Sequence, residues 1–144
     1  MYSVSVVTIN NLIASNNTQN GAVIIAHDGG LAWGPFPFNL QLTGINTFNS
    51  NGLDGLYFEA NRGNVSITKL TADNNGGDGV QGQAGGNIIL MCGSMTNNTG
   101  SGWSLQSLSL TGVVSLQGVF SYGNGTNTNP GTGVFVYVRA CPLP

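Results

Sequence analysis

The sequence predicts an all-β fold in which one chain winds into a solenoid of parallel strands. Three observations lead to this prediction. Short runs with alternating apolar residues recur along the chain, Asn and Gly stand at fixed places between the runs, and the recurrence has a period in the low twenties. A period of this length, with β-branched alternation in place of helical spacing, is typical of β-solenoids.

The runs are the expected strands. The first strand of each coil is expected in "VTINNL", "LQLTGI", "VSITKL", "IILMCG" and "VSLQGV", at 7–12, 40–45, 65–70, 88–93 and 114–119. The second begins just after a Gly in "NTQNGAVI", "NGLDGLYF", "NGGDGVQG", "NTGSGWSL" and "NPGTGVFV". In each run alternate residues are expected to point into the coil, so that stacked coils form apolar columns. The two columns predicted are Ile9, Leu42, Ile67, Leu90 and Leu116, and Ala22, Leu56, Val80, Trp103 and Val134.

A glycine anchors each coil. The five anchors are Gly21, Gly55, Gly79, Gly102 and Gly133, and we expect them to supply the unusual backbone angles of a sharp corner. The central anchors are 24 and 23 residues apart, and the first and last intervals are longer by about ten and eight residues. We assign this surplus to loop insertions at about 27–38 and 122–129. The chain then forms about five coils of about 23 residues, followed by a tail at 138–144.

An asparagine stands four residues before each anchor. These residues are Asn17, Asn51, Asn75, Asn98 and Asn129. Side chains stacked in this way can hydrogen-bond from coil to coil, as amide ladders do in stacked strands. The stretch "DNNGGDGV" at 73–80 is then a corner of the repeat. It lacks the regularly spaced ligands and the terminal Glu of an EF-hand calcium loop, so we expect neither a metal site nor a cofactor.

Length and charge exclude several classes of protein. With 144 residues, the chain is the size of one domain, and only 6% of its residues are charged, against roughly 25% in typical soluble domains. A formal net charge of −2 provides no basic surface for the phosphates of nucleic acids. No apolar run approaches the roughly 20 residues of a transmembrane helix. We therefore expect a single domain over residues 1–144, with no nucleic-acid partner and no membrane insertion.

The repeats resemble those of right-handed parallel β-helix proteins of the pectate-lyase-like type and of bacterial surface proteins and adhesins. The resemblance rests on "NVSITKLTADNNGGDGV" and "NLQLTGINTFNSNGLDGLYF" and extends from about Val4 to Tyr137. It implies a right-handed coil. The fold hosts lyases, hydrolases, tailspikes, adhesins and stalks, so an enzymatic function must be argued from a site.

Two carboxylates are the candidate catalytic residues. Asp54 and Asp78 occupy the same place in neighbouring coils, so we expect their side chains about 5 Å apart, close to the separation in retaining glycosidases. The alternative is a polar corner, because Asn20, Ser101 and Thr132 occupy the same place elsewhere. The galacturonan-hydrolase motifs and the lyase calcium cluster of the resembling enzymes do not occur in this sequence. We interpret the pair as a corner, and His27 beside Asp28 as a turn histidine without a marked nucleophile.

Aromatic residues are the candidate binding residues. Trp33, Phe36 and Phe38 lie in the first insertion, where they either pack over the solenoid or face a partner. Tyr57 and Phe135 follow their anchors by two residues, and we expect both in one outward column with Val23, Gln81 and Ser104. Such a face suits a polysaccharide or another copy of the chain.

Cys92 and Cys141 have no metal-binding spacing. The sequence does not decide between two free thiols and one disulfide.

The first coil begins close to Met1 without a capping helix, and an uncovered solenoid end can pair with other chains. We therefore expect a non-catalytic extracellular structural or adhesive element at a cell surface. It is either a filament subunit that assembles head to tail with copies of itself or a segment of a larger surface chain. The alternatives are a carbohydrate-binding module and a glycan-cleaving enzyme.

Overall fold

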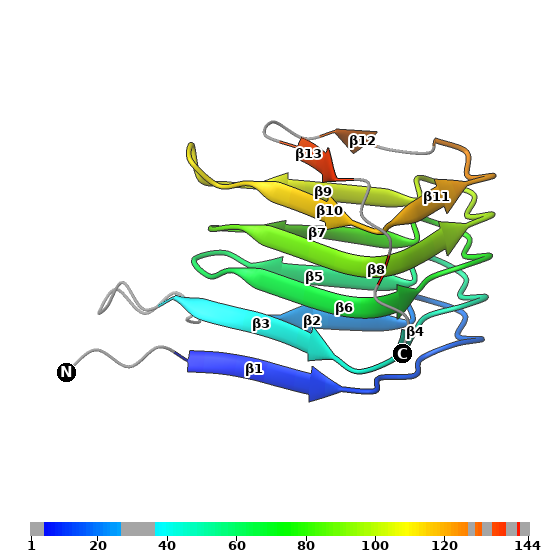
Figure 1. The fold of residues 1–144 in the computed structure, drawn as a ribbon. Helices are drawn as coiled ribbons and strands as arrows, with labels where there is room; N and C mark the ends of the chain where they lie inside the picture. Colours follow the sequence, from blue (N-terminus) through cyan, green and yellow to red (C-terminus); the bar gives the residue numbers. More distant parts are fainter. Residues whose placement is uncertain (1–4, 27–36, 127–128, 131–133, 138–140, 142–144) are drawn as a thin grey trace.

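The computed structural model describes residues 5–26, 37–126, 129–130, 134–137 and 141, and it is an all-β solenoid. Figure 1 shows the strands stacked in layers from the N-terminus upward. The front sheet orders β1 (Ser5–Asn10), β3 (Phe38–Thr43), β6 (Val65–Thr71), β8 (Ile88–Thr96), β10 (Val114–Gln117) and β13 (Val134–Tyr137), with β4 (Asn46–Thr47) beside β6 and β11 (Phe120–Tyr122) beside β8. The back sheet orders β2 (Ala22–Ile25), β5 (Leu56–Ala60), β7 (Val80–Ala84), β9 (Trp103–Ser107) and β12 (Asn129–Pro130).

Every described strand pair is parallel and joins neighbouring coils. In Figure 1 the front strands run to the right and the back strands return to the left while the chain rises, which makes the coil right-handed. The continuously described segment 37–126 makes about three turns, fewer than the five or so coils predicted for the whole chain. Strands β1 and β2 extend the two sheets below this segment, and β12 and β13 extend them above.

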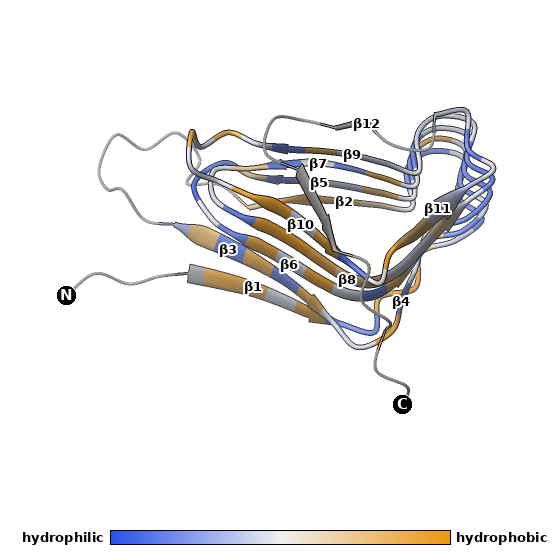
Figure 2. Ribbon diagram, turned by 45° about the horizontal axis from the view of Figure 1, so that its top comes forward, coloured by the Kyte–Doolittle hydropathy of each residue, from blue (hydrophilic) through white to orange (hydrophobic). Residues whose placement is uncertain are grey.

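The core is the space between the two sheets. The predicted column from Ile9 to Leu116 is confirmed, because each of its members pairs in register with the next. The column from Ala22 to Trp103 is confirmed as well. Its predicted last member, Val134, is wrong: Val134 pairs with Val114 in the front sheet. Figure 2 shows the apolar strands of the front sheet and the hydrophilic residues stacked at the corner where the chain crosses to the back sheet.

The predicted asparagine ladder is present at this corner. The Nδ2 group of Asn51 donates to Oδ1 of Asn75 at 3.0 Å, and Nδ2 of Asn75 donates to Oδ1 of Asn98 at 2.9 Å. Asn17 donates in the same way to Asn51. Each Oδ1 also accepts the backbone N–H of the preceding Asn in the stack, and each buried Nδ2 also donates to a backbone carbonyl. The amides of Asn51, Asn75 and Asn98 are therefore buried with their polar atoms hydrogen-bonded.

The fifth rung is Asn124, and the prediction of Asn129 is wrong. Asn98 donates from Nδ2 and from its backbone N–H to Oδ1 of Asn124, both at 2.9 Å. Asn129 lies further along the coil, in β12, where its backbone pairs with Ser104. A bridge between Ser101 and Thr126 shows that the next coil reaches this corner before the predicted anchor Gly133, which lies outside the described residues.

The cause of this shift is the position of the second insertion. The offset between paired residues is 23 for Gln83 and Gln106 and rises to 26 for Ile88 and Val114. Three extra residues therefore lie between β9 and β10, in an exposed turn at 108–112, and not at 122–129. The first predicted insertion lies mostly outside the described residues, and Phe38 begins β3. The predicted tail at 138–144 is described only at Cys141.

The anchoring glycines have a different role from the one predicted. None of the described anchors appears among the residues with positive φ; the corner angles are adopted by Asn16, Ser50, Asn74, Asn97 and Gly123. A Cβ built on Gly55 would lie 2.5 Å from the carbonyl oxygen of Gly79, and one on Gly79 would lie 2.5 Å from that of Gly102. Glycine is required here because the backbones of successive coils approach too closely for any side chain.

The ladder predicts a large cost for removing one buried amide. We expect Asn75→Ala to lower the free energy of unfolding by about 3–5 kcal/mol, because it leaves several buried partners without hydrogen bonds. Asn64→Ala is the matched control, since the Asn64 side chain is exposed and accepts one hydrogen bond, from the backbone of Asn87. We expect it to cost about 1 kcal/mol or less in urea unfolding. Equal costs for the two variants would contradict the importance of the buried ladder.

The glycine contacts predict a second pair of variants. Gly79→Ala should lower the unfolding free energy by about 3 kcal/mol, because backbone would have to move away from the new Cβ. In Gly93→Ala the Cβ would lie 3.2 Å from Cε of Met95, the far end of a flexible side chain, so we expect a change below about 1 kcal/mol. Thermal melts followed by circular dichroism compare the two. A mild Gly79→Ala phenotype would show that the coils can separate at little cost.

Candidate functional site

The predicted carboxylate pair lies at the corner that precedes the back sheet. Oδ1 of Asp54 accepts the backbone N–H of Asp78 at 2.8 Å, and Oδ1 of Asp78 accepts the backbone N–H of Ser101. In the coil below, Oδ1 of Asn20 accepts the backbone N–H of Asp54 at 2.9 Å. The two Asp residues are thus rungs of a second side-chain-to-backbone ladder, in positions that an amide fills equally well.

The environment of Asp54 disfavours its charge. Partial burial is the main cause of a pKa raised above the usual Asp value, and the nearby Asp78 carboxylate raises it further. The hydrogen bond from the Asp78 backbone opposes both effects. A raised pKa beside a second carboxylate is found in glycosidases, but here the oxygens of both residues support the corner.

The other described carboxylates are engaged in a similar way. Oδ1 of Asp73 accepts the backbone N–H of Thr96 at 2.7 Å, which makes the first residue of "DNNGGDGV" a ladder residue too. Glu59 accepts the hydroxyl of Tyr57 on the same strand. His27 and Asp28 lie outside the described residues. Among the residues that the structure does describe, no three His, Cys, Asp or Glu side chains gather into a metal-binding group.

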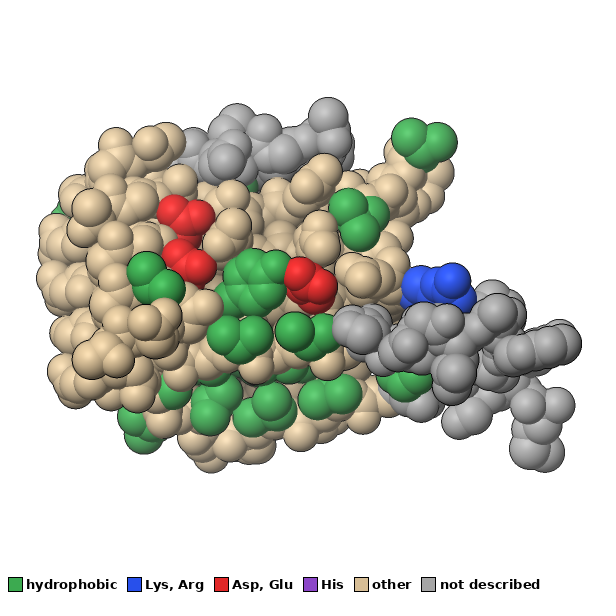
Figure 3. All heavy atoms as spheres, turned by 180° about the vertical axis from the view of Figure 1, so that it is seen from behind, with side chains coloured by type: hydrophobic (Ala, Val, Ile, Leu, Met, Phe, Trp, Pro, Cys, Tyr) green, Lys and Arg blue, Asp and Glu red, His purple; other side chains and the backbone are tan. Residues whose placement is uncertain are grey.

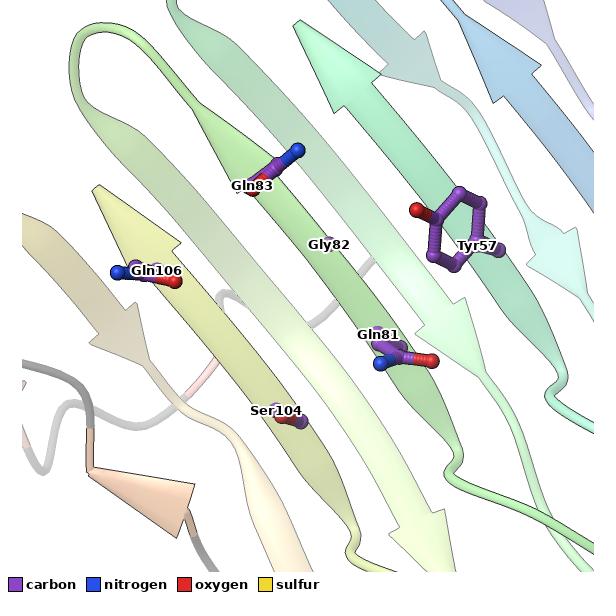
Figure 4. Close-up of a pocket in the computed structure, with 6 residues that line it drawn as sticks. All are labelled: Tyr57, Gln81, Gly82, Gln83, Ser104 and Gln106. Atoms are coloured by element: carbon purple, nitrogen blue, oxygen red, sulfur yellow. The ribbon is translucent and has the colours of Figure 1, made fainter. Parts of the chain in front are cut away.

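A shallow hollow of about 130 Å³ lies on the outer face of the back sheet. Figure 4 shows its lining, which comes from three successive strands: Tyr57 of β5, Gln81, Gly82 and Gln83 of β7, and Ser104 and Gln106 of β9. Side chains alternate between the two faces of each strand, so those of Tyr57, the three Gln residues and Ser104 lie on the outer face of the sheet. Phe58 and Leu105, which lie between them in sequence, point into the core. Gly82 also faces inward, where a Cβ would meet the Phe58 ring at 2.6 Å. The back sheet therefore presents an amide-rich surface beside one aromatic ring.

Tyr57 is held in place by its neighbour on the strand. Its hydroxyl donates to Oε1 of Glu59, two residues along β5 and on the same outer face. This hydrogen bond is the main cause of a raised Tyr57 pKa, so the hydroxyl remains a donor at neutral pH. Val23 and Ile25 of β2 lie on the same face, and each is 53% exposed. Figure 3 shows this side of the molecule, where apolar and acidic side chains gather.

The structure brings together only part of the predicted binding residues. Tyr57, Val23, Gln81 and Ser104 form the predicted outward column. Phe135 is not in this column, because it lies in β13 and pairs with Ser115 of the front sheet. Phe38 packs against the core, and Trp33 and Phe36 lie outside the described residues. Gln83 and Gln106 were not predicted as site residues, although their alternation in "VQGQA" and "WSLQS" marks them as outward-facing.

Cys92 and Cys141 form a disulfide, with their Cα atoms 5.4 Å apart. The bond ties Cys141 to the bend of the front sheet, where Cys92 has a positive φ. A second hollow, of about 310 Å³, lies beside this disulfide and is lined in part by Ile45, Lys69 and Phe120. None of the described segments is an apolar helix of membrane-spanning length.

The raised pKa of Asp54 predicts a pH-dependent effect of Asp54→Asn. The folded state retains the Asp54 proton to higher pH than the unfolded state does, so this group costs stability once the pH exceeds its folded pKa. Asparagine keeps an oxygen for the Asp78 N–H and carries no charge. We expect Asp54→Asn to raise Tm at pH 7, with the gain disappearing as the pH falls below about 3.8.

The matched variant for this experiment is Asp54→Ala, which removes both the charge and the hydrogen-bond acceptor. It should not show the same gain in Tm at pH 7, because the Asp78 N–H loses its partner. Melting curves of the wild type and the two variants between pH 3 and pH 7 test both expectations. A gain for Asp54→Asn that is the same at every pH would contradict the account.

Comparison with known proteins gives no match: no protein-family model, no curated protein and no solved structure matches this chain. The assignment as a β-solenoid rests on the parallel register of the strands and on the stacked Asn side chains.

Proposed function

We propose that this chain is a non-catalytic extracellular structural and adhesive element, built as a rigid solenoid that displays its outer faces. The observation that carries the proposal is the use made of the carboxylates. Asp54, Asp73 and Asp78 each accept a backbone N–H of the next coil, and Glu59 accepts the Tyr57 hydroxyl. Side chains that would supply acid and base catalysis in a glycosidase here hold corners and surfaces together.

The disulfide supports an extracellular location. Disulfides persist in oxidising compartments and are rare in reducing ones. Cys92 and Cys141 are 49 residues apart in sequence, so in the chain-entropy account their bond stabilises the fold by about 4 kcal/mol. A low content of charged side chains, at 6%, is also compatible with a structural element that packs against other surfaces.

The lower end of the stack supports assembly with copies of the same chain. Within the described residues, β1 pairs only with β3, and β2 pairs only with β5, so each has an open edge. The Asn ladder also has an unused acceptor at this lower end, because Oδ1 of Asn17 accepts no hydrogen bond from a described residue. A further coil with the same parallel direction, from a second copy or from a longer surface chain, would satisfy these groups.

We also propose a relationship to known repeat families. The coil with its stacked Asn side chains supports a relationship to pectate-lyase-like proteins or to adhesin-type repeats, and we favour the adhesin type because Asp54, Asp73 and Asp78 are engaged in ladders. Carbohydrate binding is a second candidate, favoured by the hollow beside Tyr57. A glycan-cleaving function through Asp54 and Asp78 is the least favoured.

Light scattering on a sizing column, followed by electron microscopy of the same sample, tests the assembly. We expect fibres with an axial repeat of about 24 Å, because the five strands of the back sheet stack at about 4.8 Å each. Val7→Lys should abolish them, because it places a charge at the inner side of the open first coil. Val6→Lys on the outer side of the same strand is the control and should leave fibres intact. A wild-type monomer at high concentration would overturn self-assembly.

A further inference from the structure

We propose that the outer face of the back sheet is a binding site for an extended, uncharged polysaccharide. Tyr57 would stack on a sugar ring, and Gln81, Gln83 and Gln106 would hydrogen-bond to its hydroxyl groups. The inference rests on the proposed function, because it names the ligand that the adhesive surface holds. It differs from that function in its site, which involves neither the stack ends nor the corner ladders.

The Tyr57 ring has the orientation that stacking requires. Figure 4 looks onto the face of the sheet and shows the ring broadside, so that it lies over β5 with a face toward solvent and Gln81 beside it. The hydrogen bond to Glu59 along the same strand holds the ring in this orientation. A fixed aromatic ring loses little conformational entropy when a ligand packs on it.

The amides beside the ring are available to a ligand. Gln81 pairs in register with Tyr57, and Gln83 with Gln106, so the outer side chains form rows across β5, β7 and β9. None of the three Gln side chains makes a hydrogen bond to another described residue. Each amide has both donors and an acceptor, which matches sugar hydroxyls that are themselves both donors and acceptors.

The spacing of these rows favours a polymer over a small molecule. Neighbouring strands lie about 4.8 Å apart, and alternate residues on one strand lie about 6.8 Å apart, so the amides form an open flat array. A small ligand is usually held in a concave cavity that covers most of its surface, whereas this hollow is shallow. An extended chain lying across the strands would contact several members of the array at once.

The charged side chains near the hollow favour an uncharged ligand. Glu59 is the only charged side chain beside the hollow among the described outward residues of β5, β7 and β9, and it is acidic. Asp54 and Asp78 lie at the corner just before β5 and β7. A uronic-acid polymer would meet carboxylates of its own sign with no cation in the lining. The lining also has more amide and hydroxyl groups than apolar ones, which suits a polyhydroxy chain better than the apolar core of a protein interface.

Affinity electrophoresis tests the proposal, using native gels that contain hydroxyethyl cellulose, galactomannan, dextran or polygalacturonate. We expect at least one of the three neutral polymers to retard the wild-type chain. Tyr57→Ala should weaken that interaction about tenfold. Gln83→Ala should weaken it about three- to tenfold. Gln41→Ala, which removes an exposed outward amide from the front sheet, is the matched control and should leave retardation unchanged.

Tyr57→Phe separates the ring from its hydrogen bond and should retain most of the binding, because the ring remains on the sheet. Thermal melts of each variant show that it is folded before its mobility is interpreted. Retardation by none of the neutral polymers, retardation by polygalacturonate alone, or equal retardation of wild type and Tyr57→Ala would overturn the proposal. Such a failure is distinguishable from failure of the structural function, because fibre formation is measured separately and does not depend on Tyr57.

Discussion

The structure depends on the hydrogen bonds between the stacked Asn side chains. Asn51, Asn75 and Asn98 lie in the interior, and each joins the coil below to the coil above through both atoms of its amide. Along each strand, apolar side chains that point inward alternate with polar ones that point outward. A shift of the strand pairing by one residue would therefore turn the apolar side chains outward. The ladder prevents such a slip, because a displaced amide would lose its hydrogen bonds in a buried place. The register of both sheets follows from this constraint.

The close approach of the backbones at Gly55 and Gly79 has a similar effect on the corner. With the corner closed and the core filled, the outward positions of each strand are free to vary without disturbing the fold. The back sheet has Val23 and Ile25 at one end, and Gln83 and Gln106 further along. Function in such a molecule is therefore expected in rows of outward side chains, which the stacking holds at fixed spacing.

The sequence predicts the fold well because the sequence motif recurs at a constant spacing wherever successive coils have nearly the same length. Asn17, Asn51, Asn75 and Asn98 each stand four residues before a glycine, and the structure stacks all four. Asn124 was missed because three extra residues in the turn at 108–112 displaced the register, while the sequence offered a better-matching Asn at 129. A local match to the repeat motif does not reveal where an insertion has entered the coil.

The roles of single residues were harder to predict than their positions. The anchoring glycines were expected to adopt unusual angles, but it is the neighbouring coil that excludes a side chain, and contacts between coils are not visible in one repeat. Phe135 was placed in the column of Tyr57 for the same reason that Asn129 was placed in the ladder. Gln83 and Gln106 were missed because a polar outward residue carries no motif. Their proposed role arises only because they line the same hollow as Tyr57.

Amide hydrogen exchange followed by nuclear magnetic resonance tests the central claim most directly. The account predicts that the backbone N–H groups of Asn51 and Asn75, with the Nδ2 protons of the same residues, exchange only through global unfolding. The backbone N–H of Asn64 and that of Asn87, bonded to exposed Asn side chains, should exchange faster. If the buried ladder protons exchanged as fast as these exposed ones, the coils would be held in register by something other than the stacked amides.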